Sequence, residues 1–323
     1  MKIVIPGGSG QVGTLLARRL VADRHEVVVL SRTPASTPWR TVVWDGRTLG
    51  EWRREFDSAD AVINLAGRSV NCRYSAANRE AILESRVSST RIVGEAIASA
   101  LSPPRVWLQA ATATIYAHRY DAANDEETGL LGGAEADVPA TWRFSIEVAR
   151  AWEQALDEAR TPQTRKVALR SAMIMSPDRD GVFDALLRLV RYGLGGQAGD
   201  GRQYVSWIHE NDFVSAIYWL LEQDSVVGPV NLSAPNPMPN AEFMHALRQA
   251  WGVPVGLPAA KWMLEIGAVL LGTETELILK SRRVTPARLL RAGFAFQFST
   301  WPEAAKDLCR QWREQNRMRR NGG

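Results

Sequence analysis

The sequence feature that most constrains the fold is a run of glycines near the start of the chain, between a strand pattern and a helical pattern. Residues 2–5 form a short apolar run typical of a buried strand, and residues 12–23 place Val12, Leu15 and Leu20 on one helical face. The turn between them consists of Gly7, Gly8, Ser9, Gly10, Gln11, Val12 and Gly13. With a second strand expected at 26–30, this order predicts a βαβ unit.

The alternation of strand and helix patterns continues along the chain. Further strands are expected at 41–44, 61–64, 105–110, 167–170 and 230–232, and helices at 49–56, 75–100, 142–160 and 210–222. Because these strands are apolar throughout, helices must cover both faces of the sheet. The sequence therefore predicts an α/β fold, a doubly wound parallel Rossmann sheet with a smaller, mostly helical C-terminal lobe.

The expected domain organisation follows from a change in the sequence pattern at the proline-rich segment 235–239, after which the segments look helical. We expect a Rossmann domain at 1–176, to which the strand near 230–232 returns, and a substrate-cleft region at 177–239. A helical subdomain is expected at 240–310, with Asn240 capping its first helix and Gly293 ending a later one. The last segment, 311–323, is interpreted as a solvated basic tail.

The glycine spacing G-x-x-G-x-x-G, placed between a strand and a helix, predicts a dinucleotide site. Glycine permits positive φ angles and lets the backbone approach a diphosphate, whose charge then meets amide groups at the helix N-terminus. We expect the segment from Gly7 to Gly13 to contact this coenzyme. A plain strand-to-helix turn is the alternative.

The end of the second expected strand distinguishes between coenzymes. An acidic residue there would bind the adenosine ribose, whereas a base would neutralise a 2′-phosphate. The chain has Ser31 and Arg32 at this point, which favours NADP(H) over NAD(H), although Arg32 as a surface loop residue is the alternative. Asp45, after the third strand, is either an adenine contact or a simple turn acid.

Composition and charge argue against several other classes of protein. The chain has 323 residues, 46% hydrophobic and 23% charged, an ordinary balance for a soluble protein, and we expect no membrane partner. Basic residues exceed acidic ones by only 39 to 35, and the arginine-rich C-terminus lacks an aromatic-studded binding module, so no nucleic-acid partner is expected. Two cysteines and four histidines show no disulfide or metal spacing, and no signal segment precedes the first strand, so a cytoplasmic location is expected.

Asn64, Leu65, Ala66 and Gly67, after the fourth strand, complete a pattern that resembles the extended short-chain dehydrogenase/reductases, the superfamily of nucleotide-sugar epimerases. The resemblance covers nearly the whole chain. It is closest to an atypical, cell-division-inhibitor-like branch of the NAD-dependent epimerase/dehydratase family, whose members carry a C-terminal domain of unknown function. Other matching stretches include 84–87, 193–196, 206–209, 234–237 and 240–243. The resemblance implies that Leu65, Ala66 and Gly67 contact the coenzyme.

The resemblance also locates the catalytic positions of the superfamily, and the chain departs from them. Thr112 matches the Ser/Thr position after the fifth strand, but Ser145 and Ala149 stand where a Tyr-x-x-x-Lys is usual. An unperturbed phenol with a pKa near 10 needs a neighbouring cation to act as a base at neutral pH. The usual proton relay is therefore missing.

Two residues are candidate substitutes in that relay. Tyr116 follows the Thr112 segment, with a structural role at the strand end as the favoured alternative. Arg86, on the long helix expected at 75–100, would hold an anionic substrate or stabilise developing negative charge. A surface ion pair with Glu84 or a neighbouring loop is the alternative for Arg86.

Substrate contacts are expected in a glycine-rich loop that carries Arg202, Gln203 and Trp207. For His209 and Asp212, helix capping and core packing are favoured over catalysis, and Cys72 is interpreted as an inert thiol.

The leading hypothesis is an NADP(H)-dependent, epimerase-like oxidoreductase acting on a small polar molecule held between the Rossmann domain and the C-terminal lobe. A catalytically silent NADP(H)-binding regulator or scaffold and a non-redox enzyme, a cyclase or dehydratase on the same fold, are the alternatives. A homodimer is expected only by analogy with the fold.

Overall fold

The computed structural model describes residues 1–135, 138–272 and 274–321. The chain divides into two compact units. Unit 1 comprises Met1–Ile115, Arg143–Ser171 and Ala216–Val230, and unit 2 comprises Tyr116–Trp142, Ala172–Ser215 and Asn231–Gly323.

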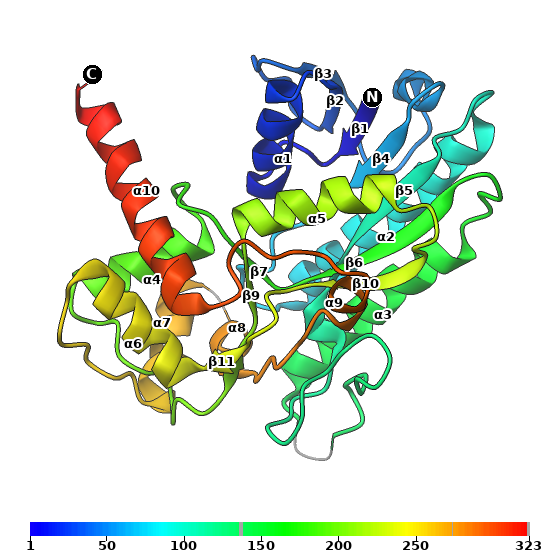
Figure 1. Cartoon of the computed structure of the whole chain (residues 1–323). Helices are drawn as coiled ribbons and strands as arrows, with labels where there is room; N and C mark the ends of the chain where they lie inside the picture. Colours follow the sequence, from blue (N-terminus) through cyan, green and yellow to red (C-terminus); the bar gives the residue numbers. More distant parts are fainter. Residues whose placement is uncertain (136–137, 273, 322–323) are drawn as a thin grey trace. The chain divides into compact units, whose positions relative to one another are not determined.

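Unit 1 is built around a seven-stranded sheet with the order β10-β6-β5-β4-β1-β2-β3 (Figure 1). Neighbouring strands from β6 to β3 pair in parallel, so the predicted α/β fold class is confirmed. The strands are β1 (Lys2–Pro6), β2 (Glu26–Ser31), β3 (Arg40–Val43), β4 (Ala61–Asn64), β5 (Val106–Thr112), β6 (Arg165–Ser171) and β10 (Gly228–Leu232).

Helices cover this sheet, and their main members are α1 (Gln11–Ala22), α2 (Ala76–Ser99), α3 (Ala140–Glu158) and α5 (Glu210–Glu222). Side chains of α2 and α3 share one buried cluster with β1, β2, β4 and β5, so these two helices pack on the same face. Trp107 on β5 is fully buried within it. Burial of each large apolar side chain contributes roughly 1.5–3 kcal/mol, which explains why the buried positions of the central strands are mostly apolar.

Two elements of unit 1 differ in detail from the prediction. The helix expected at 49–56 is a 3-10 helix, Glu51–Phe56, preceded by a turn around Asp45. The long helix begins one residue after Ser75, because the Ser75 hydroxyl accepts a hydrogen bond from the Asn78 amide and caps the helix.

Unit 2 contains short strands that the sequence did not predict. β7 (Met173–Met175) pairs in parallel with β9 (Trp207–His209), and β8 (Tyr204–Val205) pairs antiparallel with β11 (Met238–Pro239). Runs of two or three residues are too short to show a hydrophobic period. The helices are α4 (Val182–Arg191), α6 (Asn240–Trp251), α7 (Lys261–Leu271), α8 (Glu276–Leu279), α9 (Ala287–Arg291) and α10 (Trp301–Asn321).

Aromatic packing stabilises the core of unit 2. Trp301 of α10 stacks on Phe243 of α6 with ring centroids 4.0 Å apart, and its indole N–H donates to the Phe243 carbonyl. Trp207 also packs against Trp301, with ring centroids 5.1 Å apart. These contacts fasten α10 to α6 within a buried cluster of this unit.

Two predictions at helix ends need correction. Asn240 does not cap α6: its side-chain oxygen accepts from the Ala198 amide, and Pro239 occupies the capping position. The segment expected as a basic tail from residue 311 is helical as far as Asn321, as the C-terminal half of α10. Trp312 explains this continuation, because it packs edge-on against Trp251 and its indole N–H donates to Asp184.

His209 and Asp212 have structural environments. His209 is fully buried, its Nδ1 accepts from the Asn211 amide, and its ring stacks on Phe298 at 4.0 Å. The Asp212 carboxylate accepts from the amides of Gln297 and Phe298, which ties the segment before α10 to the start of α5. His209 therefore caps α5 and packs in the core, as favoured, whereas Asp212 binds the 297–298 segment and does not cap the helix.

His209 should make the stability of the protein depend on pH. Burial lowers the pKa of His209 to about 4 despite Asp307 at 3.3 Å, so the fold favours the neutral ring. Since the unfolded pKa is near 6.5, the free energy of unfolding should decrease by about 3 kcal/mol from this group as pH falls from 6.5 to 4. Above pH 7, His209 should have almost no effect on the free energy of unfolding.

Chemical denaturation at several pH values measures this dependence. His209→Gln should remove this part of the pH slope, whatever its effect on absolute stability, and the same substitution at the exposed His245 is the matched control. An identical slope in the wild type and in His209→Gln would contradict the assignment.

Candidate functional site

The glycine turn after β1 has no space for side chains at Gly7, Gly8 and Gly13. Gly7 has a φ of +74°, and a Cβ built on it would lie 2.5 Å from the Ala66 Cα. A Cβ on Gly13 would lie 2.4 Å from the Gly8 Cα. The first glycine therefore allows the loop after β4 to approach the turn, and the last allows α1 to pack on it.

The N-terminus of α1 offers backbone donors at this turn. Gly10 precedes the helix and provides no side-chain cap, and the first turn of α1 contains no acidic residue. Unpaired amide groups and the positive end of the helix dipole attract an anion. This backbone arrangement fits the diphosphate of a dinucleotide.

The loop after β4 is held beside the turn by buried polar contacts. The Leu65 amide donates to the Pro6 carbonyl at 2.8 Å, and the Ala66 amide donates to the side-chain oxygen of Asn64 at 3.1 Å. Asn64 is fully buried and donates in turn to Gln109 on β5. Asn64 is thus a positioning residue for the loop.

A cavity of about 280 Å³ within unit 1 brings most of the predicted coenzyme residues together. The predicted residues that line it are Gly7, Ser9, Gly10, Ser31, Arg32, Asp45, Ala66 and Gly67. The lining also contains six residues that were not predicted from the sequence: Trp44, Gly46, Arg47, Arg68, Ser85 and Ser89. The predicted residues outside the lining are Gly8, Gln11, Val12, Gly13 and Leu65, of which Gly8, Gly13 and Leu65 shape the turn and its neighbouring loop.

The charges around this cavity are mainly positive. Arg32, Arg47 and Arg68 line it together with one carboxylate, Asp45. Arg47 pairs with Glu84 at 2.9 Å, and Arg68 donates to a side-chain amide oxygen. Within the described part of the chain, Arg32 has no carboxylate partner, so its charge is available to an anion.

Asp45 has the contacts of a turn acid. Its carboxylate accepts from the amides of Arg47 and Thr48 and from the Thr48 hydroxyl, and these hydrogen bonds lower the pKa of Asp45 to about 2. The group is ionised at neutral pH and fixes the loop that carries Arg47. Its predicted contact with adenine stays a prediction.

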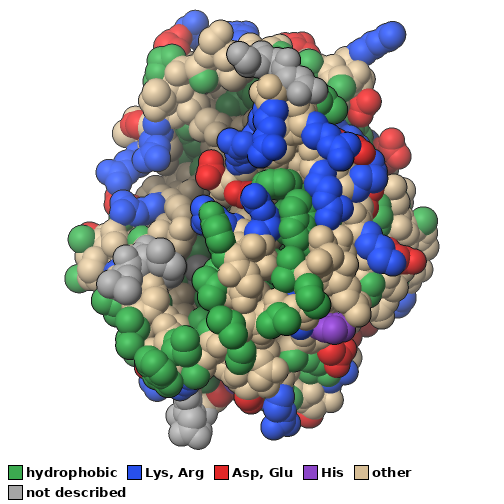
Figure 2. Space-filling model, turned by 90° about the vertical axis from the view of Figure 1, so that its left-hand side faces the viewer, with side chains coloured by type: hydrophobic (Ala, Val, Ile, Leu, Met, Phe, Trp, Pro, Cys, Tyr) green, Lys and Arg blue, Asp and Glu red, His purple; other side chains and the backbone are tan. Residues whose placement is uncertain are grey.

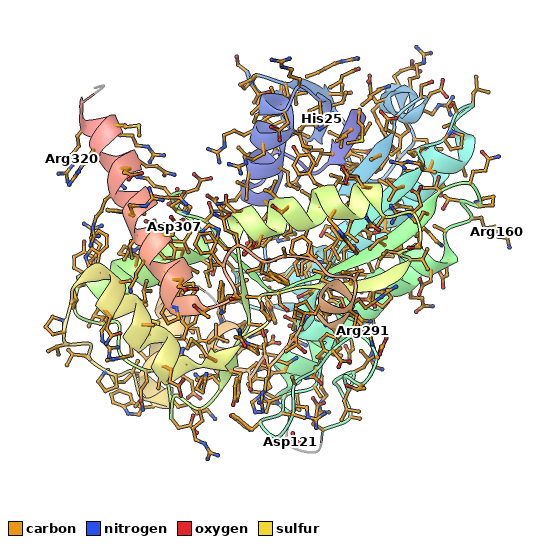
Figure 3. All side chains as sticks on the ribbon, viewed as in Figure 1. His25, Asp121, Arg160, Arg291, Asp307 and Arg320 are labelled. Carbon is orange, nitrogen blue, oxygen red and sulfur yellow. The ribbon has the colours of Figure 1, made fainter. Side chains whose placement is uncertain are left out.

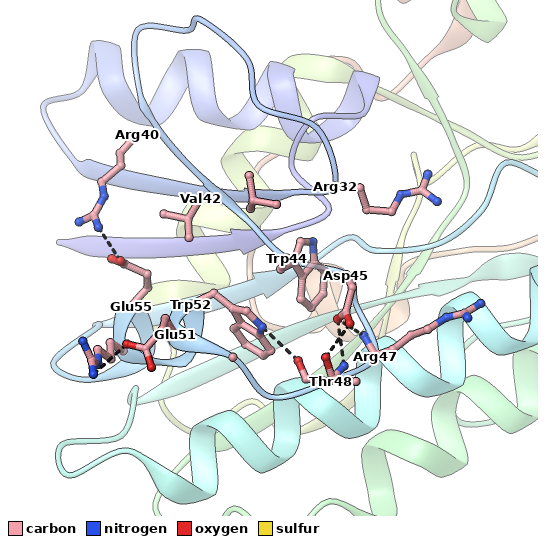
Figure 4. Close-up of a pocket in the computed structure, with 13 residues that line it drawn as sticks. Arg32, Arg40, Val42, Trp44, Asp45, Arg47, Thr48, Glu51, Trp52 and Glu55 are labelled. Atoms are coloured by element: carbon pink, nitrogen blue, oxygen red, sulfur yellow. Dashed lines mark hydrogen bonds and ion pairs between the residues drawn. The ribbon is translucent and has the colours of Figure 1, made fainter.

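A second cavity of about 920 Å³ shares Arg32, Trp44, Asp45 and Arg47 with the first (Figure 4). Its other charged groups are largely paired. Arg40 donates to Glu55 at 2.6 Å and Arg54 pairs with Glu51 at 2.8 Å. Arg32 lines both cavities, and among the described residues it has no carboxylate partner.

Arg86 lies beside the loop that borders the first cavity. A Cβ on Gly67 would lie 3.3 Å from the central guanidinium carbon of Arg86, which itself sits 4.9 Å from the ring centroid of Trp152. Burial lowers the pKa of Arg86 to about 10, so it remains charged at neutral pH. The alternative of an ion pair with Glu84 is wrong, because Glu84 pairs with Arg47.

The conventional catalytic positions are occupied as the sequence predicts. Thr112 ends β5, and its hydroxyl accepts from the Thr114 amide at 3.1 Å. On α3, the Ser145 hydroxyl lies 3.5 Å from the Tyr74 hydroxyl, and Ala149 is buried. No lysine is present on α3 to depress the pKa of a phenol.

Tyr116 belongs to unit 2 and has a structural environment. Its side chain is 2% exposed, and its hydroxyl donates to the side-chain oxygen of Asn231 at 3.0 Å. The predicted catalytic role of Tyr116 is corrected to the alternative, a structural role at the end of the strand. A buried phenol whose hydroxyl is already hydrogen-bonded offers no surface to a substrate.

The loop expected to contact substrate is only partly exposed. Gln203 is 2% exposed and donates to the carbonyls of Ala198 and Ile278, and Trp207 is fully buried. The prediction for these two residues is corrected: they order the loop and the core. Arg202 is exposed, with its guanidinium 5.7 Å from the ring centroid of Tyr120, and stays a candidate.

A polar cluster near Tyr120 in unit 2 was not predicted from the sequence. His118 Nδ1 accepts from the Ser281 amide at 2.8 Å, and Lys280 is buried near Glu276 with a 4.0 Å separation. Burial lowers the pKa of Lys280 to about 8. The contacts join segments about 160 residues apart, so no local signal could reveal them.

Comparison with known proteins decides the family. The profile of the family described as NAD dependent epimerase/dehydratase matches residues 3–232. The chain belongs to this family. A second profile, for a domain of unknown function, matches residues 259–308. The resemblance inferred from the sequence is therefore confirmed.

Three similar proteins match this chain over nearly all of its own length. Epimerase family protein SDR39U1 from Bos taurus is 32% identical over 314 residues, which is 95% of this chain and 99% of that protein. The crystal structure of human SDR39U1, isoform 2, with NADPH has a TM-score of 0.83 at 28% identity and covers 96% of this chain and 99% of its own. A nucleoside-diphosphate sugar epimerase from Corynebacterium glutamicum has a TM-score of 0.72 at 25% identity, covering all of this chain and 67% of its own.

Two further properties concern the described residues only. No helix among them is both long and apolar enough to cross a bilayer. Nor do they contain a group of three or more His, Cys, Asp or Glu side chains placed to hold a metal ion.

Proposed function

We propose that the chain binds NADP(H) in the 280 Å³ cavity of unit 1 and is an epimerase-like oxidoreductase that acts on a small polar substrate. The observation that carries the coenzyme assignment is that Gly7 and Arg32 line the same cavity, and that the turn has no space for a side chain at Gly7. Backbone amides would hold the diphosphate, and Arg32 would meet the 2′-phosphate. The NADPH in the human SDR39U1 structure supports this assignment.

Bound NADP(H) would supply hydride transfer, and the residues of the chain would orient and polarise the substrate. We assign Arg86 to substrate binding: its charge, half-buried beside Gly67, would hold an anionic group or stabilise negative charge that develops on an oxygen. The Thr112 hydroxyl would donate to the same substrate. Arg86 has no carboxylate partner among the described residues, which supports this role.

The assay is coenzyme oxidation or reduction with a panel of nucleotide sugars and small carbonyl compounds. We expect turnover of one compound class, and Arg86→Met should lower that turnover about 100-fold or more while the affinity for NADPH changes less than about threefold. Arg86→Lys should be intermediate, since it keeps the charge and loses the planar fork.

Arg91→Met is the matched control, because Arg91 is an exposed arginine on the same helix, 4.0 Å from Glu158. Turnover unaffected by Arg86→Met would remove Arg86 from the site. An equal loss of turnover in Arg86→Met and Arg91→Met would also exclude Arg86 from the site.

A silent NADP(H)-binding regulator is the second candidate, and the Ser145 and Ala149 positions on α3 favour it. It predicts NADPH binding without turnover of any compound in the panel. A cyclase or dehydratase predicts turnover that persists after the nicotinamide coenzyme has been removed.

A further inference from the structure

Unit 2 has a cavity of its own, and the residues that line it lie far along the sequence from the coenzyme residues. We call it the arginine pocket: a cavity of about 800 Å³ lined by α4, the segment just before it and the C-terminal half of α10, with Trp251 and Trp312 in its wall. The space-filling view of the α10 side shows blue Lys and Arg side chains gathered on this face (Figure 2).

Seven arginines line the arginine pocket, against two carboxylates, Asp180 and Asp184. Asp184 is already engaged, because it accepts from the Trp312 indole at 2.9 Å and from the Asp180 amide at 3.3 Å. None of the seven arginines has a carboxylate within ion-pair distance in the part of the chain that the structure describes.

The remaining arginine of α10, Arg310, behaves differently. Arg310 pairs with both Asp307 and Glu314, so the helix does provide carboxylates, on a different part of its surface. Figure 3 labels Asp307 and Arg320 on this helix. Among the described residues, the arginines of α10 that have no carboxylate partner are those that line the pocket: Arg313, Arg317, Arg319 and Arg320.

Aromatic stacking holds two of the pocket's guanidinium groups in place. The Arg191 guanidinium lies 4.7 Å from the Trp312 ring centroid and 5.9 Å from that of Trp251. Arg313 lies 4.1 Å from the Trp251 centroid and donates to its carbonyl. Because stacked guanidinium groups are ordered in advance, less conformational entropy is lost when they bind an anion.

Packing alone does not account for the remaining arginines. Arg179 donates to Asn316 at 2.8 Å, and Arg188 lies on α4 across the cavity from the α10 arginines. Like charges gathered around one concavity repel each other unless an anion is present. The positive N-terminus of α4, where Gly181 provides no side-chain cap, adds to the same potential.

We propose that the arginine pocket binds a small soluble molecule that carries several phosphate groups. Planar guanidinium forks match phosphate oxygens in pairs, and the excess of five positive side chains over carboxylates calls for a multiply charged ligand. The concave shape favours a small molecule over a duplex or a membrane, which would contact arginines along a line or a plane. Arg191 and Arg313 stack on the two tryptophans, so these rings offer little surface for bases of single-stranded nucleic acid.

Isothermal titration calorimetry with inorganic tripolyphosphate tests the proposal, with NADPH at saturation so that the cavity of unit 1 is occupied. We expect one tripolyphosphate per chain, bound less tightly as salt increases. Arg188→Glu with Arg317→Glu should weaken binding at least about tenfold, because two of the attracting charges become repelling ones.

The matched control is Arg53→Glu with Arg160→Glu, which makes the same charge change at exposed positions of unit 1. It should leave the affinity within about twofold of wild type. Arg188→Lys with Arg317→Lys keeps the charges without the planar forks and should give an intermediate affinity, which also serves if the charge-reversed variant does not fold.

The proposal is overturned if tripolyphosphate does not bind, or if the control weakens it as much as the pocket variant. It is also overturned if a DNA duplex or phosphatidylserine vesicles bind at the same arginines while tripolyphosphate does not. The test is independent of the proposed function: should NADPH fail to bind, the same titration can be made without it.

Discussion

Gly7→Ala should lower the affinity for NADPH at least about 100-fold. Two separate costs arise at this position. The left-handed φ of +74° disfavours a side chain by roughly 1–2 kcal/mol. In addition, the new methyl would lie 2.5 Å from the Ala66 Cα and 2.6 Å from its amide nitrogen, both backbone atoms. The loop from Asn64 to Gly67 must therefore move away from the turn, and the two walls of the coenzyme cavity separate.

Gly228→Ala separates these two costs. Gly228 has the same φ of +74°, but nothing lies within 4 Å of the position of its Cβ. We expect this control to destabilise the protein by about 1–2 kcal/mol and to leave NADPH binding unchanged. Fluorescence titration and chemical denaturation of both variants measure the difference. NADPH binding by Gly7→Ala that matches Gly228→Ala would show that the approach of the two loops is not needed.

Arg32→Ala should weaken NADPH binding about 10- to 100-fold with little effect on NADH. A hydrogen bond to a charged group is worth about 1.5–3 kcal/mol, and only NADPH carries the 2′-phosphate that Arg32 would meet. Arg47 is less suited to compensate, because Glu84 already neutralises it at 2.9 Å. The ratio of the two dissociation constants, rather than either value, reports the role of Arg32.

Arg54→Ala provides the control for this ratio. Arg54 lines the larger of the two cavities and is exposed, but it pairs with Glu51. It should leave the preference for NADPH unchanged. An equal loss of NADPH and NADH affinity in Arg32→Ala would mean that Arg32 supports the fold of the site, and no loss would place the 2′-phosphate elsewhere.

Local sequence signals predicted the sheet and the coenzyme turn well. The strand at Ala61–Asn64 was predicted to the residue, and the helix at Glu210–Glu222 likewise. Both elements carry a regular pattern of apolar residues, which is the signal that local sequence reasoning detects. The glycine turn could be predicted for a related reason, since its geometry depends on φ angles and on contacts with the strand beside it.

The roles of individual polar side chains depended on contacts that the sequence does not show. Arg86 was placed on the correct helix, but its position against Trp152 and Gly67 required the packing of α2 on α3. Gln203 looked like a ligand contact because it follows glycines. Its amide instead satisfies the buried carbonyls of Ala198 and Ile278, a demand that becomes visible only when the loop is folded.

Interactions between distant segments limited the prediction of unit 2. The basic residues near the C-terminus were interpreted as a solvated tail because no aromatic-studded binding module accompanies them. Trp312 decides otherwise, through Trp251 and Asp184, which lie 61 and 128 residues away. The same contacts create the arginine pocket, so neither the helix nor the pocket could be foreseen from the charge pattern alone.

The most direct test of the coenzyme assignment is a pair of fluorescence titrations of the wild-type chain with NADPH and with NADH at the same ionic strength. We predict saturable binding of one NADPH per chain, at least about tenfold tighter than NADH, because Arg32 can neutralise the additional phosphate. Equal affinities, or no binding of NADPH, would contradict the account.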